Sequence, residues 1–114
     1  MENIIEVKSF NFAVRIVKLY KYLTAKKKEY VLSNQLLKSG TSIGANVCEA
    51  QKGQSKADFN AKMNIALKEA NETDYWLRLL RTTEYISEKE YNSIKPEIEE
   101  IIAILVAICK KTNK

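Results

Sequence analysis

Two of the three glycines in this chain, Gly40 and Gly44, lie four residues apart inside a segment whose apolar residues recur at the period of an α-helix. A glycine in a helix interior costs roughly 0.5–1 kcal/mol relative to alanine, so both positions need a compensating interaction. Leu36, Ile43 and Val47 share the helix side that carries both glycines. The segment therefore predicts a helix that a second helix approaches closely.

The whole chain of 114 residues contains only one proline and three glycines, which is too little turn material for an all-β fold. Apolar residues repeat at helical spacing over residues 9–26 and 30–52, and two more helices are expected to open after the capping residues Ser55 and Ser87. We expect Pro96 to kink or break the last helix. Short connections between four such helices predict an all-α fold, an antiparallel up-down-up-down four-helix bundle, in a single domain over residues 1–114.

The third and fourth helices carry more apolar residues than one small core needs. The third helix has a second apolar stripe beside its main one, and the fourth is apolar on nearly every side beyond Pro96. A helix with two apolar sides usually has two partners. We therefore expect an interface between subunits at Ile65, Trp76, Leu79, Ala103, Val106 and Ala107.

Positive charge is concentrated near the N-terminus of a chain whose net charge is +5. Residues 8–28 contain seven positive side chains and no negative one, with a tyrosine among them. Lysines along a helix neutralise phosphates, and an exposed aromatic ring stacks on an unpaired base. This pattern predicts nucleic-acid binding, with RNA or DNA as the partner, at Lys8, Arg15, Lys18, Lys21, Tyr22, Lys26, Lys27 and Lys28.

Two other interpretations of the basic segment stay open. Most surface helices have a solvated lysine side with no binding role. A basic amphipathic helix can also lie on an anionic membrane, but here we expect the apolar side to be used by the bundle core, so no membrane partner is predicted.

The residue types argue against catalysis. The chain contains no histidine, so the commonest general base is missing, and Cys48 and Cys109 have no imidazole to activate them. Neither glycine-rich nucleotide-binding pattern occurs. We expect no enzymatic activity, no cofactor and no metal site, and we expect the carboxylates of the third helix, Glu69, Glu72 and Asp74, to form salt bridges with Arg78 and Arg81.

The remaining features predict a cytoplasmic protein. The first residues have neither the basic start nor the long apolar run of a signal peptide, and the longest apolar run, residues 101–109, is too short to cross a bilayer. Two cysteines are too few for a disulfide framework, so buried thiols in a reducing compartment are expected.

Residues 35–50 resemble the second helix of the 23S-rRNA-intervening-sequence protein family. The matching positions are Ser39, Ser42, Ile43, Asn46, Val47 and Glu49, while Cys48 and Ala50 depart mildly. The blocks 55–59 and 65–77 are similar to that family's helix-3 segment. The resemblance covers nearly the whole chain.

This resemblance implies an antiparallel four-helix bundle that assembles into a homopentameric ring. Some family members are encoded within intervening sequences of ribosomal RNA genes. The family is also similar in fold to the accessory variability determinant of diversity-generating retroelements, a basic pentamer that binds RNA and a reverse transcriptase. The resemblance thus implies a homo-oligomeric adaptor for nucleic acid, most of all RNA. The alternative is a protein-interaction scaffold, or an accessory subunit of a reverse transcriptase, without direct nucleic-acid contact. For the family positions Asn46 and Glu49 we expect hydrogen bonds between helices or subunits.

Overall fold

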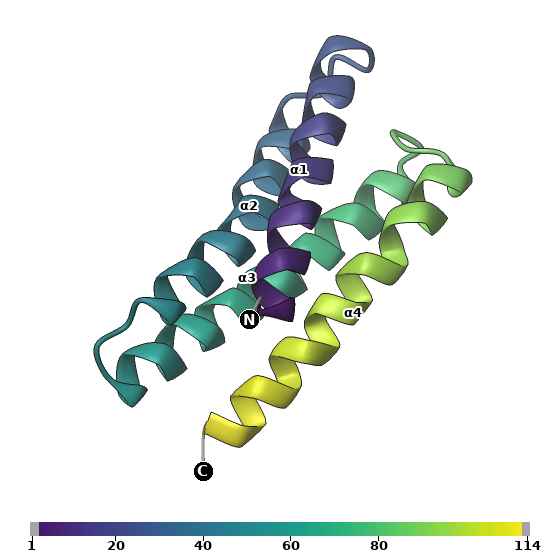
Figure 1. The fold of residues 1–114 in the computed structure, drawn as a ribbon. Coiled ribbons are helices and arrows are strands. Elements are labelled where there is room, and N and C mark those ends of the chain that lie inside the picture. The colour runs from purple at the N-terminus through teal and green to yellow at the C-terminus, as the bar shows by residue number, and fades with distance from the viewer. Residues whose placement is uncertain (1–2, 113–114) are drawn as a thin grey trace.

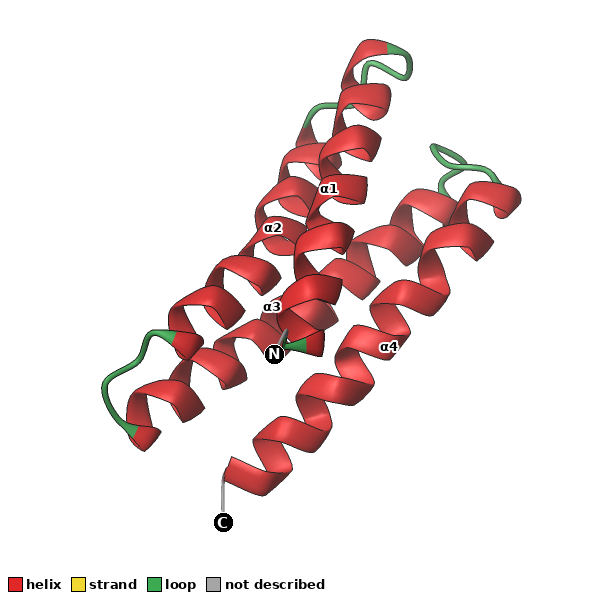
Figure 2. Cartoon of the chain, in the orientation of Figure 1, coloured by secondary structure: helices red, strands yellow, loops and turns green. Residues whose placement is uncertain are grey.

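The computed structural model describes residues 3–112 and contains four α-helices, with no strand in that range (Figures 1 and 2). They are α1 (Ile4–Ala25), α2 (Val31–Gln51), α3 (Lys56–Thr82) and α4 (Glu88–Thr112). Each helix runs antiparallel to the one before it and packs against it, and α4 closes the bundle with a smaller contact to α1. The predicted four-helix all-α fold is confirmed.

Local capping signals explain where α3 and α4 begin. The Ser55 hydroxyl accepts a hydrogen bond from the backbone N–H of Asp58 at 3.0 Å. At α4, Ser87 and Glu90 form a reciprocal capping box, with N–H to side-chain oxygen distances of 2.9 and 3.1 Å. Both predicted starts are confirmed.

The start of α1 differs from the prediction. The helix begins at Ile4 rather than near Ser9, because the Asn3 side chain accepts a hydrogen bond from the N–H of Ile5 at 3.1 Å and so caps the helix. Ile5 and Ser9, in the added turn, are buried. The first turn of α1 therefore belongs to the bundle.

A carboxylate that the sequence analysis overlooked caps α2. The side chain of Glu29 is only 9% exposed and accepts hydrogen bonds from the N–H groups of Val31, Leu32 and Ser33 at 3.2, 3.1 and 2.7 Å. The Ser33 hydroxyl adds a fourth contact at 2.8 Å. Burial raises the pKa of Glu29, but these hydrogen bonds together lower it further, so the pKa lies below the ordinary value and the group is held as a carboxylate.

The two glycines of α2 sit where α1 comes closest. A Cβ added to Gly40 would lie 2.8 Å from two side-chain carbons of Ile16, and one added to Gly44 would lie 3.3 Å from the backbone oxygen of Ser9. The close approach that the glycine spacing predicts is confirmed.

Pro96 does not break α4, which continues from Glu88 to Thr112. The expectation of a break was wrong. A proline removes the donor for the carbonyl four residues earlier, which belongs to Asn92. Both Pro96 and Asn92 are exposed, so water can reach that carbonyl, and the ring does not intrude on the core.

All four helices contribute to one hydrophobic core, with fully buried Phe12, Leu36, Met63 and Leu105 among its members. One polar pair lies inside it: Thr73 Oγ1 of α3 is 3.0 Å from Ser39 Oγ of α2 and 2.8 Å from the carbonyl oxygen of Glu69. None of the four helices described combines the length and the apolar character needed to cross a membrane.

Candidate nucleic-acid interface

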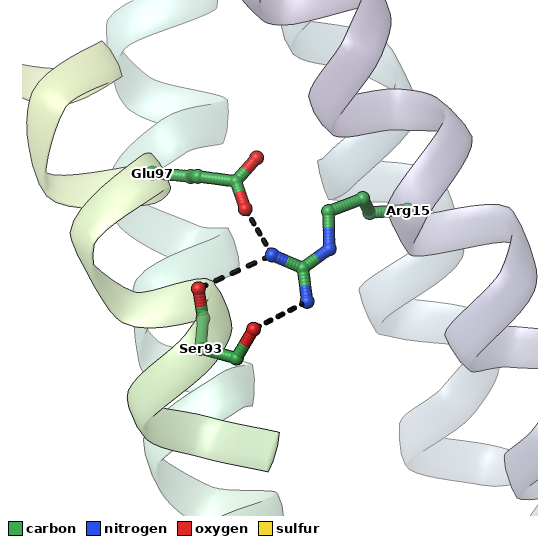
Figure 3. Close-up of polar contacts among 3 residues, drawn as sticks. All are labelled: Arg15, Ser93 and Glu97. Atoms are coloured by element: carbon green, nitrogen blue, oxygen red, sulfur yellow. Dashed lines mark hydrogen bonds and ion pairs between the residues drawn. The ribbon is translucent and has the colours of Figure 1, made fainter. Parts of the chain in front are cut away.

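The structure divides the predicted basic residues of α1 into two groups. The first group, Lys8 and Arg15, lies beside α4 rather than on the outward side of α1. Lys8 Nζ is 2.8 Å from a carboxylate oxygen of Glu100. The Arg15 guanidinium pairs with Glu97 and donates to the Ser93 carbonyl and hydroxyl oxygens at 3.2 and 3.1 Å (Figure 3).

These contacts give Lys8 and Arg15 a structural role where α1 meets α4. Each cation is matched by a carboxylate, so a phosphate would have to displace an existing partner. Half-exposed pairs of this kind contribute at most about 1 kcal/mol each, but the three contacts of Arg15 fix the position of one guanidinium. The two residues are therefore poor candidates for direct phosphate contacts.

The second group consists of exposed lysines without a carboxylate partner in the described part of the chain: Lys18, Lys21, Lys26, Lys27 and Lys28. The first two lie on α1, and the other three form the start of the connection to α2. This connection lies at one end of the bundle (Figure 1). Lys28 has a positive φ of 55°, which lets the chain reverse direction there. Within residues 8–28, the cations without a carboxylate partner thus lie on α1 and at the end of the bundle where α1 joins α2. We call Lys26, Lys27 and Lys28 the lysine tip.

Tyr22 is half-buried and packs against the core. Lys27 Nζ lies 6.0 Å from the centre of its ring, at the outer limit of a cation–π contact. A stacking base would therefore have to displace the Lys27 side chain.

A groove of about 670 Å³ lies beside Tyr22, between α1 and the start of α4. Its lining combines the apolar side chains of Leu19, Ile86 and Ile94 with the cations Arg15, Lys18 and Lys89 and the carboxylate of Glu90. Lys89 was missed by sequence reasoning. Only the folded bundle brings the first turn of α4 next to Lys18, and no local pattern signals this.

The residues predicted to form a subunit interface differ in how far they are exposed in the single chain. Ile65 and Val106 are 41% and 39% exposed, and Ala103 and Ala107 are exposed as well. Trp76 and Leu79 are half-buried. Trp76 packs against the core, and its indole N–H is buried without a hydrogen-bond partner.

The largest exposed apolar side chains of α1 were not singled out by the sequence analysis. Ile4, Val7, Phe10, Val14 and Val17 lie on the side of α1 away from the core. We call these five residues the outward stripe. The sequence does indicate this stripe, because the residues from Val7 to Val17 alternate in spacing between three and four, which places them on one helix side.

The acidic residues of α3 only partly follow the prediction. Arg78 pairs with Asp74 at 3.4 Å, as expected, but Arg81 approaches Glu88 at the start of α4. Burial, and then the neighbouring carboxylate of Glu72, raise the pKa of Glu69.

The two polar family positions on α2 also differ in their contacts. Glu49 links α2 to α3 through a 2.7 Å ion pair with Lys62, and the hydrogen bond and charge of that lysine lower the pKa of Glu49. Asn46 instead donates to the carbonyl of Ser42 in its own helix. The expected interhelical contact is therefore found for Glu49 and not for Asn46.

Comparison with known proteins identifies a matching family and a similar solved structure. Residues 1–107 match the family described as 23S rRNA-intervening sequence protein. A similar solved structure is that of a protein with unknown function from the S23 ribosomal protein family of Bacteroides thetaiotaomicron VPI-5482. The two chains are 57% identical, the alignment covers 95% of this chain and 96% of the other, and the TM-score is 0.92. No curated protein matches the sequence.

Proposed function

This chain belongs to the 23S rRNA-intervening sequence protein family, and on that premise we propose that it is a non-enzymatic, homo-oligomeric protein that binds RNA. The observation that carries the proposal is the group of five exposed lysines, Lys18, Lys21 and the lysine tip, which have no carboxylate partner among the described residues. The ribosomal RNA in the name of the family, and the ribosomal protein family in the name of the similar structure, support RNA as the partner and the cytoplasm as the place of action.

The expected binding is electrostatic and weak for a single subunit. Each phosphate contact to single-stranded nucleic acid lowers the slope of log K against log salt by about 0.7, so the lysine tip alone gives a slope of about −2, and all five lysines give about −3.5. An oligomer repeats the lysine tip on every subunit and strengthens binding by avidity. We propose a closed ring, of five subunits as the family resemblance implies.

The lysine tip provides a direct test of the proposal. The triple variant Lys26→Glu, Lys27→Glu, Lys28→Glu should bind a single-stranded RNA at least about tenfold more weakly than wild type at low salt, with a salt slope shallower by about 2. Binding would be followed by fluorescence anisotropy at several salt concentrations.

A matched control changes the same charge at the opposite end of the bundle. Lys52, Lys56 and Lys110 are also exposed, lie at the other end, and can be changed to glutamate together. This control should bind RNA far better than the tip variant. If both variants bind as well as wild type, the RNA proposal is refuted. In that case the alternative of a protein scaffold, or of an accessory subunit of a reverse transcriptase, becomes the better explanation.

A further inference from the structure

The outward stripe is the most unusual surface of the molecule. Its five side chains are 36–68% exposed, and Phe10 is the most exposed of them. They follow one another along more than three turns of a single helix. By contrast, α3 exposes Ile65 and Tyr75 far apart along its length, and Val106 of α4 has only alanines as exposed apolar neighbours on its helix. Single exposed apolar residues are ordinary, but a contiguous row of this kind marks a contact surface.

The area of the stripe matches the apolar part of a stable protein interface. Taken together, the exposed fractions equal about two and a half fully exposed side chains, or roughly 400–500 Å² of apolar surface. A standard interface buries about 800 Å² on each partner, of which somewhat more than half is apolar. The stripe alone therefore supplies the apolar area that one side of such an interface requires.

A recess lies directly beside the stripe. A groove of about 690 Å³ runs between α1 and α2, lined by Val7 and Phe10 on one side and by Gly44, Ala45 and Cys48 on the other. Gly44 has no side chain to fill it, and Ala45 adds only a methyl group. One surface thus presents both a projecting aromatic ring and an apolar recess next to it.

The charges around this surface have opposite signs at its two ends. Glu6 lines the groove near the start of α1, while Lys18 and Lys21 lie beside Val17 near the other end. The ammonium groups of one copy can therefore face the carboxylate beside the groove of the next copy. The carboxylate also disfavours an anionic bilayer as the occupant.

From these observations we infer that the outward stripe and its groove bind a second copy of this chain. Phe10 of one copy occupies the groove between α1 and α2 of the next. Each copy supplies one ring and one groove, so the inference identifies the contact surface for the proposed oligomer and leaves the number of subunits to the mass measurement. It uses a different surface from Ile65, Trp76, Leu79, Ala103, Val106 and Ala107.

Light scattering after size-exclusion chromatography tests the surface. The double variant Phe10→Ser, Val14→Ser should weaken self-association by roughly 30-fold or more and move the particle mass toward that of a single chain. Ala45→Arg, which fills the groove from an exposed position, should have the same effect. All of these side chains are exposed in the single chain, so the far-ultraviolet circular dichroism should stay that of wild type.

The double variant Ile65→Ser, Val106→Ser is the matched control, since it removes two apolar residues of comparable exposure from α3 and α4. Its particle mass should equal that of wild type. A monomeric wild type would overturn the inference. So would a control variant that dissociates while the Phe10 variant stays assembled. A monomeric wild type would also remove the avidity of the proposed oligomer, whereas direct RNA binding by the lysine tip is measured separately on the same variants.

A cross-linking experiment tests the position of Phe10. A chain carrying Phe10→Cys and Cys48→Ser is mixed and re-equilibrated with wild-type chains and treated with a short thiol cross-linker. Cys48 of the wild type is half-buried in the groove, while Cys109 is buried. A product of two chains is expected, and it should vanish when both chains carry Cys48→Ser. A failure to form this product in mixed oligomers of normal mass would refute the placement of Phe10.

Discussion

Adding a single methyl group at Gly40 tests the close contact between α1 and α2. Gly40→Ala should gain about 0.8–1.0 kcal/mol from the higher helix propensity of alanine. The new Cβ, however, would lie 2.8 Å from both γ-carbons of Ile16, a fully buried, β-branched side chain. Such a side chain has little rotamer freedom with which to yield, and overpacking of this kind costs about 1–3 kcal/mol. With two contacts this short we expect a cost in the upper part of that range. The net loss of unfolding free energy should be about 1–2 kcal/mol, or roughly 5–10 °C in melting temperature.

Gly44→Ala is the matched comparison within the same helix. Its Cβ would meet the Ser9 backbone oxygen at 3.3 Å, which requires a shift of only a few tenths of an ångström. The gain in helix propensity should nearly cancel that cost, leaving this variant within about 0.5 kcal/mol of wild type. Urea unfolding followed by circular dichroism, at one protein concentration throughout, measures both variants.

A double-mutant cycle with Ile16→Ala assigns the cost to the contact itself. Ile16→Ala alone should cost about 2–5 kcal/mol because it opens a cavity. In that background both γ-carbons are gone, so Gly40→Ala should become neutral or stabilising, which gives a favourable coupling of about 1–2 kcal/mol. If Gly40→Ala destabilises both backgrounds equally, or stabilises the wild type, then Ile16 is not what requires a glycine at this position.

Three further perturbations address the capping and polar contacts. Glu29→Gln should cost about 1–3 kcal/mol in urea unfolding at neutral pH. The folded-state pKa of Glu29 lies below 4.5, so the stability that its carboxylate contributes is present above that pH and is lost as the pH falls through the folded-state pKa. The difference in unfolding free energy between wild type and variant should therefore narrow as the pH falls. A difference that stays constant would contradict this. Glu84 has a φ of 68°, so Glu84→Gly should raise the unfolding free energy by about 0.5–1 kcal/mol, and a lower melting temperature would argue against strain there. Thr73→Val should lower the unfolding free energy by about 1–2 kcal/mol, because it leaves the Ser39 hydroxyl poorly bonded. Adding Ser39→Ala should recover part of this loss. Strictly additive effects of the two substitutions would show that the two hydroxyls do not interact.

The features of the fold that were predicted correctly are determined by residues close to one another in the sequence. Ser55 and Ser87 cap helices through partners three residues away, and the spacing of Gly40 and Gly44 reports a contact along one helix side. Glu29 is also a local cap, but its carboxylate stands outside the usual cap position and was not recognised. Helix starts and one close contact could therefore be predicted without any knowledge of how the helices are arranged.

Within the predicted nucleic-acid interface, the sequence could not show which cations have partners on distant helices. The seven cations of residues 8–28 look alike in sequence, but the register of α4 places Glu97 beside Arg15 and Glu100 beside Lys8. These partners are about 80–90 residues away along the chain, so no pattern within the basic segment identifies which cations they neutralise. The lysine tip remained unpaired because it lies in a connection, past the end of α1.

The arrangement of α1 explains how one helix can serve both proposals. Its core stripe and its outward stripe lie on opposite sides, so α1 is apolar both toward its own bundle and away from it. The helix continues for about nine residues from Val17 to Lys26, roughly 13 Å at 1.5 Å per residue. A second copy seated on the outward stripe would therefore leave the lysine tip beyond the edge of the contact, free to reach phosphates. It follows that the tip variant should keep the particle mass of wild type while losing RNA affinity. The Phe10 variant should keep the salt slope per subunit while losing the avidity that the oligomer provides. If the loss of RNA affinity and the loss of self-association cannot be separated in this way, the subunit contact and the RNA surface overlap on α1. Lys18 and Lys21 are then the residues that the two surfaces share.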